Sequence, residues 1–150
     1  MNEFMEKTIE LAKKANKFGE VPIGAVIEKD GRIIACGFNK REKTKNAIMH
    51  AEIIAISKAC KKLKDWRLEG CTMYVTLEPC PMCAGAILNA RLSKVFYGAK
   101  DKTAEDDILT TISKSTRLNH NCEFTQMQEY EKECASLLSN FFKDKRKNTD

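Results

Sequence analysis

Two short motifs carry side chains that can bind zinc and move protons. The first is His50-Ala51-Glu52 and the second is Pro79-Cys80-Pro81-Met82-Cys83. An imidazole and two thiolates are natural zinc ligands, and three protein ligands leave the fourth tetrahedral position for water. We therefore expect His50, Cys80 and Cys83 to bind one zinc ion in a site that is open for catalysis.

Glu52 is the candidate proton carrier of this site. It stands two residues after His50, and in the first turn of a helix both side chains can reach the same cavity. Zinc lowers the pKa of a bound water toward neutrality and so supplies hydroxide at pH 7. Glu52 can take the proton of that water and deliver it to a ring nitrogen and then to a departing amine. The chemistry that these residues predict is hydrolytic deamination.

Both ligand sets are expected at the start of a helix. His50 and Cys80 each precede a run of apolar and small residues, and Pro81 suits a first helical turn because its missing N–H is not needed there. The positive end of the helix dipole favours Cys80 as a thiolate. A strand predicted from Thr72 to Leu77 ends just before the cysteines, at the carboxyl end where open α/β sheets place their sites.

The other elements alternate between strands and helices. Their patterns predict a helix over 4–18, a hairpin of strands over 22–27 and 32–37 joined at Asp30-Gly31, a strand over 94–98, a helix through 108–112, a strand over 122–128 and a helix over 130–142. The hairpin is antiparallel, and later strands are parallel because helices connect them. We therefore predict a single domain over residues 1–150, a three-layer α/β/α fold with a mixed five-stranded sheet.

Gly24 and Ala25 in the first strand leave two interpretations open. Their small side chains could let a flat ligand or another backbone approach closely, or they could serve tight packing against a helix. Asn39, which follows the second predicted strand, could be a turn residue.

Composition narrows the class of protein. The chain has 150 residues, with 43% hydrophobic and 31% charged, and no apolar run approaches the ~18 residues of a membrane span. Without a secretory leader in the sequence, we expect a cytoplasmic location and no membrane partner. Seven cysteines are an odd number for a disulfide framework. We expect the five outside the motif to be small buried side chains: Cys36, Cys60, Cys71, Cys122 and Cys134.

Charge is distributed unevenly around a net value of +5. Basic segments at 40–45 and 143–147 are compatible with a polyanionic partner. The segment 101–107 holds four acidic residues against one lysine and would repel phosphates. Within it, Thr103 and Asp106 resemble an N-terminal capping box for the helix that follows.

Other interpretations of the motifs explain only half of the pattern. His50 alone could be a core histidine, and the cysteine pair alone could be a redox motif or half of a structural zinc site. A structural site would need a fourth ligand, and His120 is the only other histidine. The three-ligand set together with Glu52 fits catalysis better.

The two motifs together resemble the zinc-dependent cytidine and nucleobase deaminase superfamily. Further stretches make the chain similar to bacterial tRNA adenosine deaminases of the TadA type. These are Gly19-Glu20-Val21-Pro22-Ile23-Gly24-Ala25-Val26, Trp66-Arg67-Leu68-Glu69-Gly70 and residues 74–86. The resemblance implies a cytidine-deaminase-like fold.

The resemblance also implies a reaction and its residues. Zinc held by His50, Cys80 and Cys83, with Glu52 as proton shuttle, would convert adenosine to inosine and ammonia at the wobble position of a tRNA anticodon loop. It further implies a homodimer and these substrate contacts: Asn39 to the base, Ala51 to the base through its backbone, Ile23 and Leu77 as pocket walls, and Asp101 near the sugar.

Two other functions remain open from the sequence. Residues 46–49 and the acidic segment after Asp101 depart from the family's usual pattern. A deaminase of a free nucleobase or nucleoside, of the guanine, adenine or cytosine type, would tolerate an acidic segment better than an RNA enzyme would. A zinc-stabilised binding module without catalysis is the third hypothesis, and the loss of turnover on changing Glu52 to Ala would exclude it.

Overall fold

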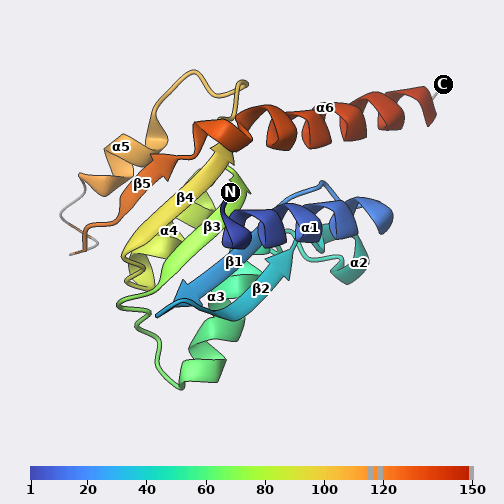
Figure 1. Cartoon of the computed structure of the whole chain (residues 1–150). Helices are drawn as coiled ribbons and strands as arrows, with labels where there is room; N and C mark the ends of the chain where they lie inside the picture. Colours follow the sequence, from blue (N-terminus) through green and yellow to red (C-terminus); the bar gives the residue numbers. More distant parts are fainter. Residues whose placement is uncertain (115–116, 118–119, 149–150) are drawn as a thin grey trace.

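A mixed five-stranded sheet forms the centre of the molecule, as the sequence predicts (Figure 1). The computed structural model describes residues 1–114, 117 and 120–148. The strands are β1 (Gly24–Lys29), β2 (Arg32–Phe38), β3 (Thr72–Leu77), β4 (Lys94–Ala99) and β5 (Glu123–Gln126), in the spatial order β2-β1-β3-β4-β5. β1 pairs antiparallel with β2 and β3, whereas β3, β4 and β5 are parallel.

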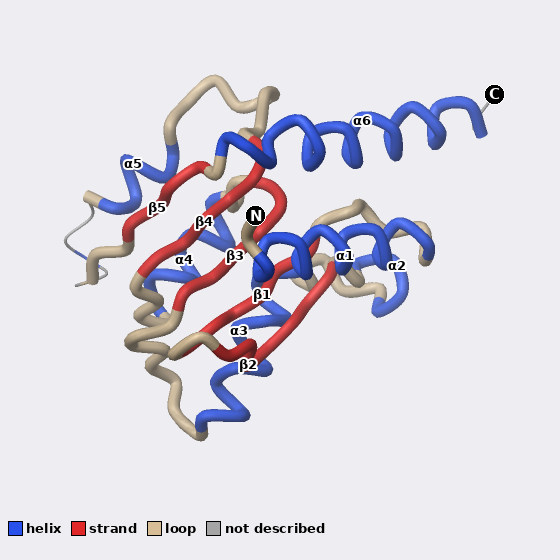
Figure 2. Tube along the Cα trace, in the orientation of Figure 1, coloured by secondary structure: helices blue, strands red, loops and turns tan. Residues whose placement is uncertain are grey.

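Helices cover both faces of the sheet and complete three layers (Figure 2). The helices are α1 (Glu3–Lys17), α2 (Arg41–Thr44), α3 (Ala51–Leu63), α4 (Pro81–Asn89), α5 (Ile108–Ser113) and α6 (Glu131–Asn148). On one face, α1 and α6 pack on Val26 and Tyr74. On the other face, α3, α4 and α5 pack on Ala25, Ile27 and Val75. The alternation of strand residues between the two cores is the two-residue period of a buried strand.

The expected helix starts are confirmed for both zinc motifs, since α3 begins after His50 and α4 begins after Cys80. β3 runs from Thr72 to Leu77, as predicted, and α3 ends at Leu63. β1 begins at Gly24 instead of Pro22, and β5 is shorter than predicted because the 3₁₀ helix η2 (Gln128–Tyr130) follows it.

Residues 41–44 form the short helix α2 inside the basic segment 40–45, where the sequence pattern predicted no helix. The helix buries none of its own residues, so its sequence shows no apolar period. Its start is held from elsewhere in the chain, because the buried Glu20 carboxylate accepts hydrogen bonds from the backbone N–H groups of Glu42 and Lys43. Such a cap from a distant residue is not visible in a local pattern.

The predicted capping box at Thr103 is wrong. The Thr103 backbone N–H and hydroxyl donate to Asp101, in a local turn before the helix. Helix α5 begins later, and Asp107 is its N-cap, with the side chain accepting from the Thr110 N–H. Asp107 thus satisfies an otherwise unpaired backbone N–H in the first turn of α5.

Two glycines allow helices to lie unusually close to the sheet. A Cβ atom on Gly24 would meet the Thr8 carbonyl oxygen of α1 at 2.2 Å, so Gly24 serves helix packing, which decides between the two interpretations of this strand. A Cβ atom on Gly37 would meet the Ala51 carbonyl oxygen at 2.4 Å and the Ala55 nitrogen at 2.9 Å. Gly37 thus sets the position of the first turn of α3, where His50 and Glu52 lie.

All seven cysteines are free thiols. Cys71, Cys122 and Cys134 are buried, and Cys36 and Cys60 are half-buried. The expected burial is therefore confirmed for three of the five outside the motif and is partial for the other two. Among the helices of the described residues, none is long and apolar enough to cross a membrane.

Candidate metal and catalytic site

The three predicted ligands come from the first turns of two neighbouring helices. His50 is the N-cap residue of α3, and Cys80 is the N-cap residue of α4, where Pro81 occupies the first helical position. Cys83 follows in the first turn of α4 and is fully buried, whereas His50 and Cys80 are half-buried. Each N-cap has extended backbone, so its side chain turns away from the helix and toward the other motif.

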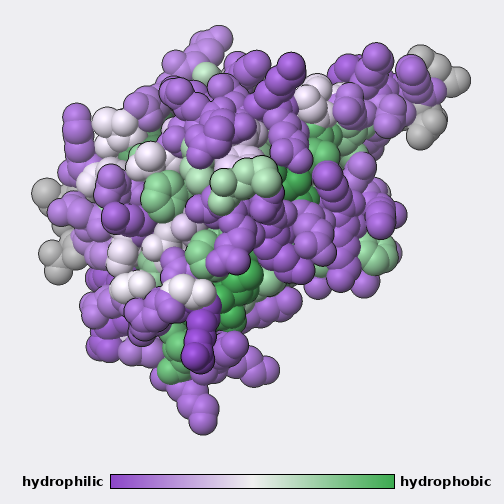
Figure 3. Space-filling view, in the orientation of Figure 1, coloured by the Kyte–Doolittle hydropathy of each residue, from purple (hydrophilic) through white to green (hydrophobic). Residues whose placement is uncertain are grey.

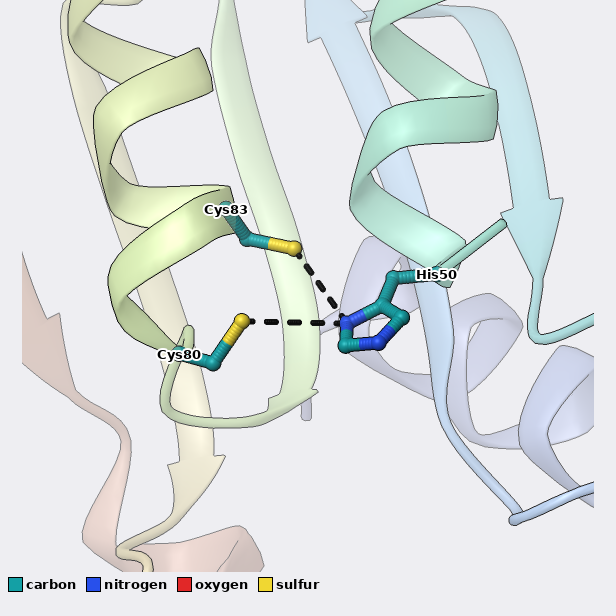
Figure 4. A group of neighbouring side chains, drawn as sticks. All are labelled: His50, Cys80 and Cys83. Atoms are coloured by element: carbon teal, nitrogen blue, oxygen red, sulfur yellow. Dashed lines mark hydrogen bonds between the residues drawn. The ribbon is translucent and has the colours of Figure 1, made fainter. Parts of the chain in front are cut away.

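The three side chains converge on one point (Figure 4). The Nδ1 atom of His50 lies 3.7 Å from Cys80 Sγ and 3.5 Å from Cys83 Sγ, and all three ligand atoms lie within 4.8 Å of one another. Nitrogen and sulfur ligands bonded at about 2.0 Å and 2.3 Å to a tetrahedral zinc ion are about 3.5 Å apart. The spacing and the donor set therefore fit a zinc ion with three protein ligands.

The environment prepares one thiol for metal binding. A hydrogen bond from the Cys83 thiol is the main cause that lowers the pKa of Cys80 to about 5, and the imidazole of His50 acts in the same direction. The same hydrogen bond and burial raise the pKa of Cys83, so without a metal one proton stays between the two sulfurs. A thiolate is the form that binds metal, and Cys80 supplies it at neutral pH.

Glu52 is buried beside the ligands. Its residue is only 4% exposed, and its carboxyl group interacts with Cys83. Burial disfavours the charged carboxylate and raises the pKa of Glu52 to about 7. A carboxyl group with this pKa can accept and release protons near neutral pH, which is what a general acid and base must do.

Asn39 connects the end of β2 to the start of α3. Its side-chain oxygen accepts a hydrogen bond of 2.8 Å from the Ala51 N–H, and its own backbone N–H donates to the Ile23 carbonyl at 3.2 Å. Asn39 is 3% exposed. The structure therefore brings Asn39, Ala51 and Ile23 together next to His50, and it gives Asn39 a positioning contact that neither sequence interpretation included.

Leu77 and Asp101 lie together in a different place. Both line a groove of about 440 Å³ against α6, with Leu138 and Phe142 on its other wall. Leu77 packs with the core on the α1 and α6 face, whereas Ile23 packs with the core on the opposite face. The two predicted pocket walls are thus at the same end of the sheet but belong to different cores.

Sequence reasoning assigned no functional role to Glu78, and the structure shows it bonded to the backbone near the ligands. Its Oε1 atom accepts a hydrogen bond of 2.6 Å from the Asp101 N–H, while its backbone N–H donates to the Ala99 carbonyl. Glu78 therefore fixes the loop after β4 relative to the cysteine motif. Its position directly before Pro79-Cys80 was the only local indication of this contribution.

His120 is not placed to be a fourth ligand. Its Nε2 atom lies 2.7 Å from the carbonyl oxygen of Leu92, which follows α4 at the end opposite Cys80. In the part of the chain that the structure describes, the only group of three or more metal-binding side chains is His50, Cys80 and Cys83. The open three-ligand interpretation fits this placement, and the four-ligand structural site does not.

Comparison with known proteins gives consistent results. The family model described as MafB19-like deaminase matches residues 1–146. The tRNA-specific adenosine deaminase of Bacillus subtilis is 48% identical over 145 residues, which cover 96% of this chain and 89% of that protein. A solved structure from work on A-to-I editing by tRNA:A34 deaminases is 39% identical, with a TM-score of 0.75, over 82% of this chain and 95% of that one.

A solved guanine deaminase from Bacillus subtilis is also similar. It is 46% identical with a TM-score of 0.64, and the match covers 67% of this chain and 66% of that chain. The likeness of both solved structures agrees with the predicted fold class.

Proposed function

This chain belongs to the deaminase family that includes the tRNA-specific adenosine deaminases, and we propose that it converts adenosine to inosine at the wobble position of a tRNA anticodon loop. The observation that carries the proposal is the convergence of His50, Cys80 and Cys83 beside the buried Glu52. Full-length similarity to tRNA-specific adenosine deaminases supports the choice of substrate.

In this proposal, His50, Cys80 and Cys83 hold one zinc ion per subunit. When bound, zinc acts as a Lewis acid that makes water a nucleophile at neutral pH. Glu52 takes a proton from the attacking water and donates it to the purine ring as C6 is attacked. It then assists the departure of ammonia, so that adenosine and water give inosine and ammonia.

The remaining predicted residues orient the base. Asn39 and the Ala51 backbone are placed next to His50. The Ile23 carbonyl oxygen accepts a hydrogen bond from the Asn39 backbone N–H. Leu77 and Asp101 line the adjoining groove against α6. We propose that the first group contacts the base and that the groove receives the sugar side of the nucleotide. A base in a single-stranded loop can enter such a site without the cost of opening a duplex.

The placement of charge supports an RNA substrate. The acidic segment 101–107 follows β4, near the β5 edge of the sheet, whereas the basic segment 40–45 follows β2 at the opposite edge. Phosphates that approach from the β2 side therefore meet lysines before they meet carboxylates. The acidic segment does not by itself argue against a polyanionic substrate.

Deamination of a free base is the second candidate. It is motivated by the acidic residues Asp106 and Asp107 in the pocket next to β4 and β5, and by the likeness to the guanine deaminase structure. A neutral base would need none of the phosphate contacts that RNA requires.

Ammonia release distinguishes the two candidates. Zinc-loaded protein is given an anticodon stem-loop with a wobble adenosine, the same stem-loop with a wobble guanosine, and a panel of free bases and nucleosides. The proposal expects turnover on the adenosine stem-loop alone and a steep fall in rate with added salt. Turnover only on a free base, with little salt dependence, would replace it by the second candidate. The Glu52→Ala variant is the control, because it should keep zinc and lose turnover.

Three further proposals follow from the resemblance. We propose that residues 1–150 form a single deaminase domain. We also propose a homodimer, for which the exposed apolar side chains of Ile48 and Met82 beside the metal ligands offer a contact surface. Light scattering during gel filtration tests that assembly. The cytoplasmic location stays a prediction that accords with a tRNA substrate.

A further inference from the structure

Three lysines surround a pair of stacked aromatic rings at the end of α1. Phe18 stacks on Phe38 with ring centroids 6.2 Å apart and planes inclined by 10°. The ammonium groups of Lys40 and Lys14 lie 4.8 Å and 5.5 Å from the centroid of Phe38, and that of Lys43 lies 5.3 Å from the centroid of Phe18. We call these five residues the lysine–phenylalanine patch.

Among the described residues, no ion pair is seen between a lysine of the patch and a carboxylate. The ion pairs seen there join Lys7 to Glu10 and Arg67 to Asp65. The buried Glu20 uses both carboxylate oxygens to accept backbone hydrogen bonds at the start of α2. The contacts that the three patch lysines make here are with the aromatic rings.

The ammonium groups repel one another. Partial burial, followed by repulsion from Lys58, Lys43 and Lys14, lowers the pKa of Lys40. Each cation–π contact at an exposed site stabilises the folded arrangement by about 0.5–1 kcal/mol. They hold the three lysines in one place but do not remove the repulsion between them, which an anion would remove.

The patch is exposed and lies beside the catalytic residues. Phe18 is 55% exposed, and Lys14 and Lys43 are exposed as well. Figure 3 shows mainly hydrophilic side chains over the end of α1 and over α2. Lys40 directly follows Asn39, and its backbone N–H donates to the carbonyl of Met49, the residue before His50. The segment that carries Lys40 is therefore hydrogen-bonded to the segment that carries His50. A molecule bound on the patch would lie next to the site.

A solvated lysine surface is the ordinary alternative, since many exposed lysines bind nothing. The lysines at the end of α3 show that case, because Lys61 and Lys62 lie at a helix C-terminus, where the dipole favours them. The patch differs because Lys14 of α1 and two lysines of the basic segment 40–45 come from separate parts of the chain and converge on one ring pair. Basic side chains interleaved with aromatic rings are the arrangement that nucleic-acid surfaces use.

Resting on the proposed RNA substrate, we propose that the lysine–phenylalanine patch binds backbone phosphates of the tRNA anticodon arm. Phosphate contacts fix the register of a nucleic acid without reading its sequence. In this position they would orient the loop so that the wobble base points toward Glu52. The patch is a positioning surface, and it takes no part in the chemical step.

The test is a salt titration of RNA binding. Binding of a fluorescent anticodon stem-loop is followed by anisotropy on zinc-loaded Glu52→Gln protein, which cannot turn the substrate over. The variant K14Q/K40Q/K43Q is compared with K61Q/K62Q/K94Q, which also removes three exposed positive charges but at the opposite end of the strands and helices. Both variants have the same net charge.

We expect the slope of log affinity against log salt to be smaller by about 2 in the patch variant, since each of the three phosphate contacts contributes about 0.7 to the slope. Extrapolated from 1 M to 0.1 M salt, this is a loss of about 100-fold in affinity. The exposed pair K14Q/K43Q should flatten the plot by about 1.4 and guards against misfolding of the triple variant. In the background that retains Glu52, KM for the stem-loop should rise while kcat stays near the original value.

Equal salt slopes in the patch and control variants would overturn the inference about the patch. If the unsubstituted protein still deaminated the stem-loop, the proposed function would stand without the patch. An unsubstituted protein that does not bind the stem-loop would overturn both. An affinity loss of the expected size would support the patch even if the preferred reaction proved to be on another nucleotide.

Discussion

Replacing Gly37 by alanine should damage the site through packing alone. The added Cβ atom would stand 2.4 Å from the Ala51 carbonyl oxygen and 2.9 Å from the Ala55 nitrogen, both backbone atoms of α3. Ordinary contact requires at least about 3.4 Å, so the start of α3 must move by about 1 Å. His50 and Glu52 move with it, whereas Cys80 and Cys83 belong to α4.

Two measurable effects follow. Overpacking of this kind costs about 1–3 kcal/mol of unfolding free energy, which urea denaturation would detect. A displacement of about 1 Å at the reacting groups can reduce turnover on the order of 100-fold. Zinc affinity should also fall, since the His50 Nδ1 atom would leave its present distances of 3.5 Å and 3.7 Å from the two sulfurs.

Gly85→Ala is the matched control. It makes the same substitution in α4, where an added Cβ atom would meet nothing within 4 Å. We expect it to stabilise the protein by about 1 kcal/mol, because alanine is the better helix former. If Gly37→Ala retained the stability, zinc content and turnover of the Gly85→Ala variant, close packing of β2 against α3 would not be what positions the site.

Four other outcomes are expected. Removing the metal with a chelator should abolish ammonia release and lower the melting temperature, and added zinc should restore both; activity that survives full metal depletion, confirmed by atomic absorption, would contradict the metal assignment. His120→Ala should leave the zinc content unchanged, whereas loss of zinc would show that it is a ligand. Asn39→Ala should leave the Ala51 N–H without its acceptor and cost about 1–3 kcal/mol, while Asn39→Asp, which keeps an oxygen there, should lose less; equal denaturation midpoints would refute this. In metal-free protein, burial raises the pKa of Glu52 from 4.5 to about 7, so the folded state loses stability as the pH rises from 4.5 through 7. Glu52→Gln should therefore raise the free energy of unfolding by about 3 kcal/mol at pH 8 and by almost nothing below pH 4.5. A difference in unfolding free energy that does not change with pH would argue against the raised pKa.

The grouping of His50, Cys80 and Cys83 could be predicted from the sequence because residue type and local spacing indicate it. Cys80 and Cys83 are three residues apart, so the first turn of a helix brings them together, and Glu52 lies in the first turn that follows the N-cap His50. The fold class was predictable for a similar reason. Periodicity and the Asp30-Gly31 turn are local properties, and the alternation of strands with helices then restricts the sheet to a few topologies.

Contacts between distant segments could not be predicted. Glu20 caps α2, Glu78 holds Asp101, and Asn39 orients Ala51, and each of these hydrogen bonds joins residues that no short pattern relates. The same limit explains the wrong cap at Thr103, because the sequence offered several acceptors and only the packed loop determined that Asp107 would be used.

The sequence by itself determined which atoms can bind the metal and carry the proton, because those properties belong to side chains and to their nearest neighbours. The tertiary structure alone decided that Glu52 is buried enough to raise its pKa, since burial depends on everything packed around it. It alone placed the acidic segment after β4 and the basic segment after the edge strand β2, because strand order is a property of the whole chain. The approach of Lys14 to Lys40 and Lys43 around two rings is likewise visible only after folding, since α1 meets the end of β2 and the start of α2 in space and not in sequence.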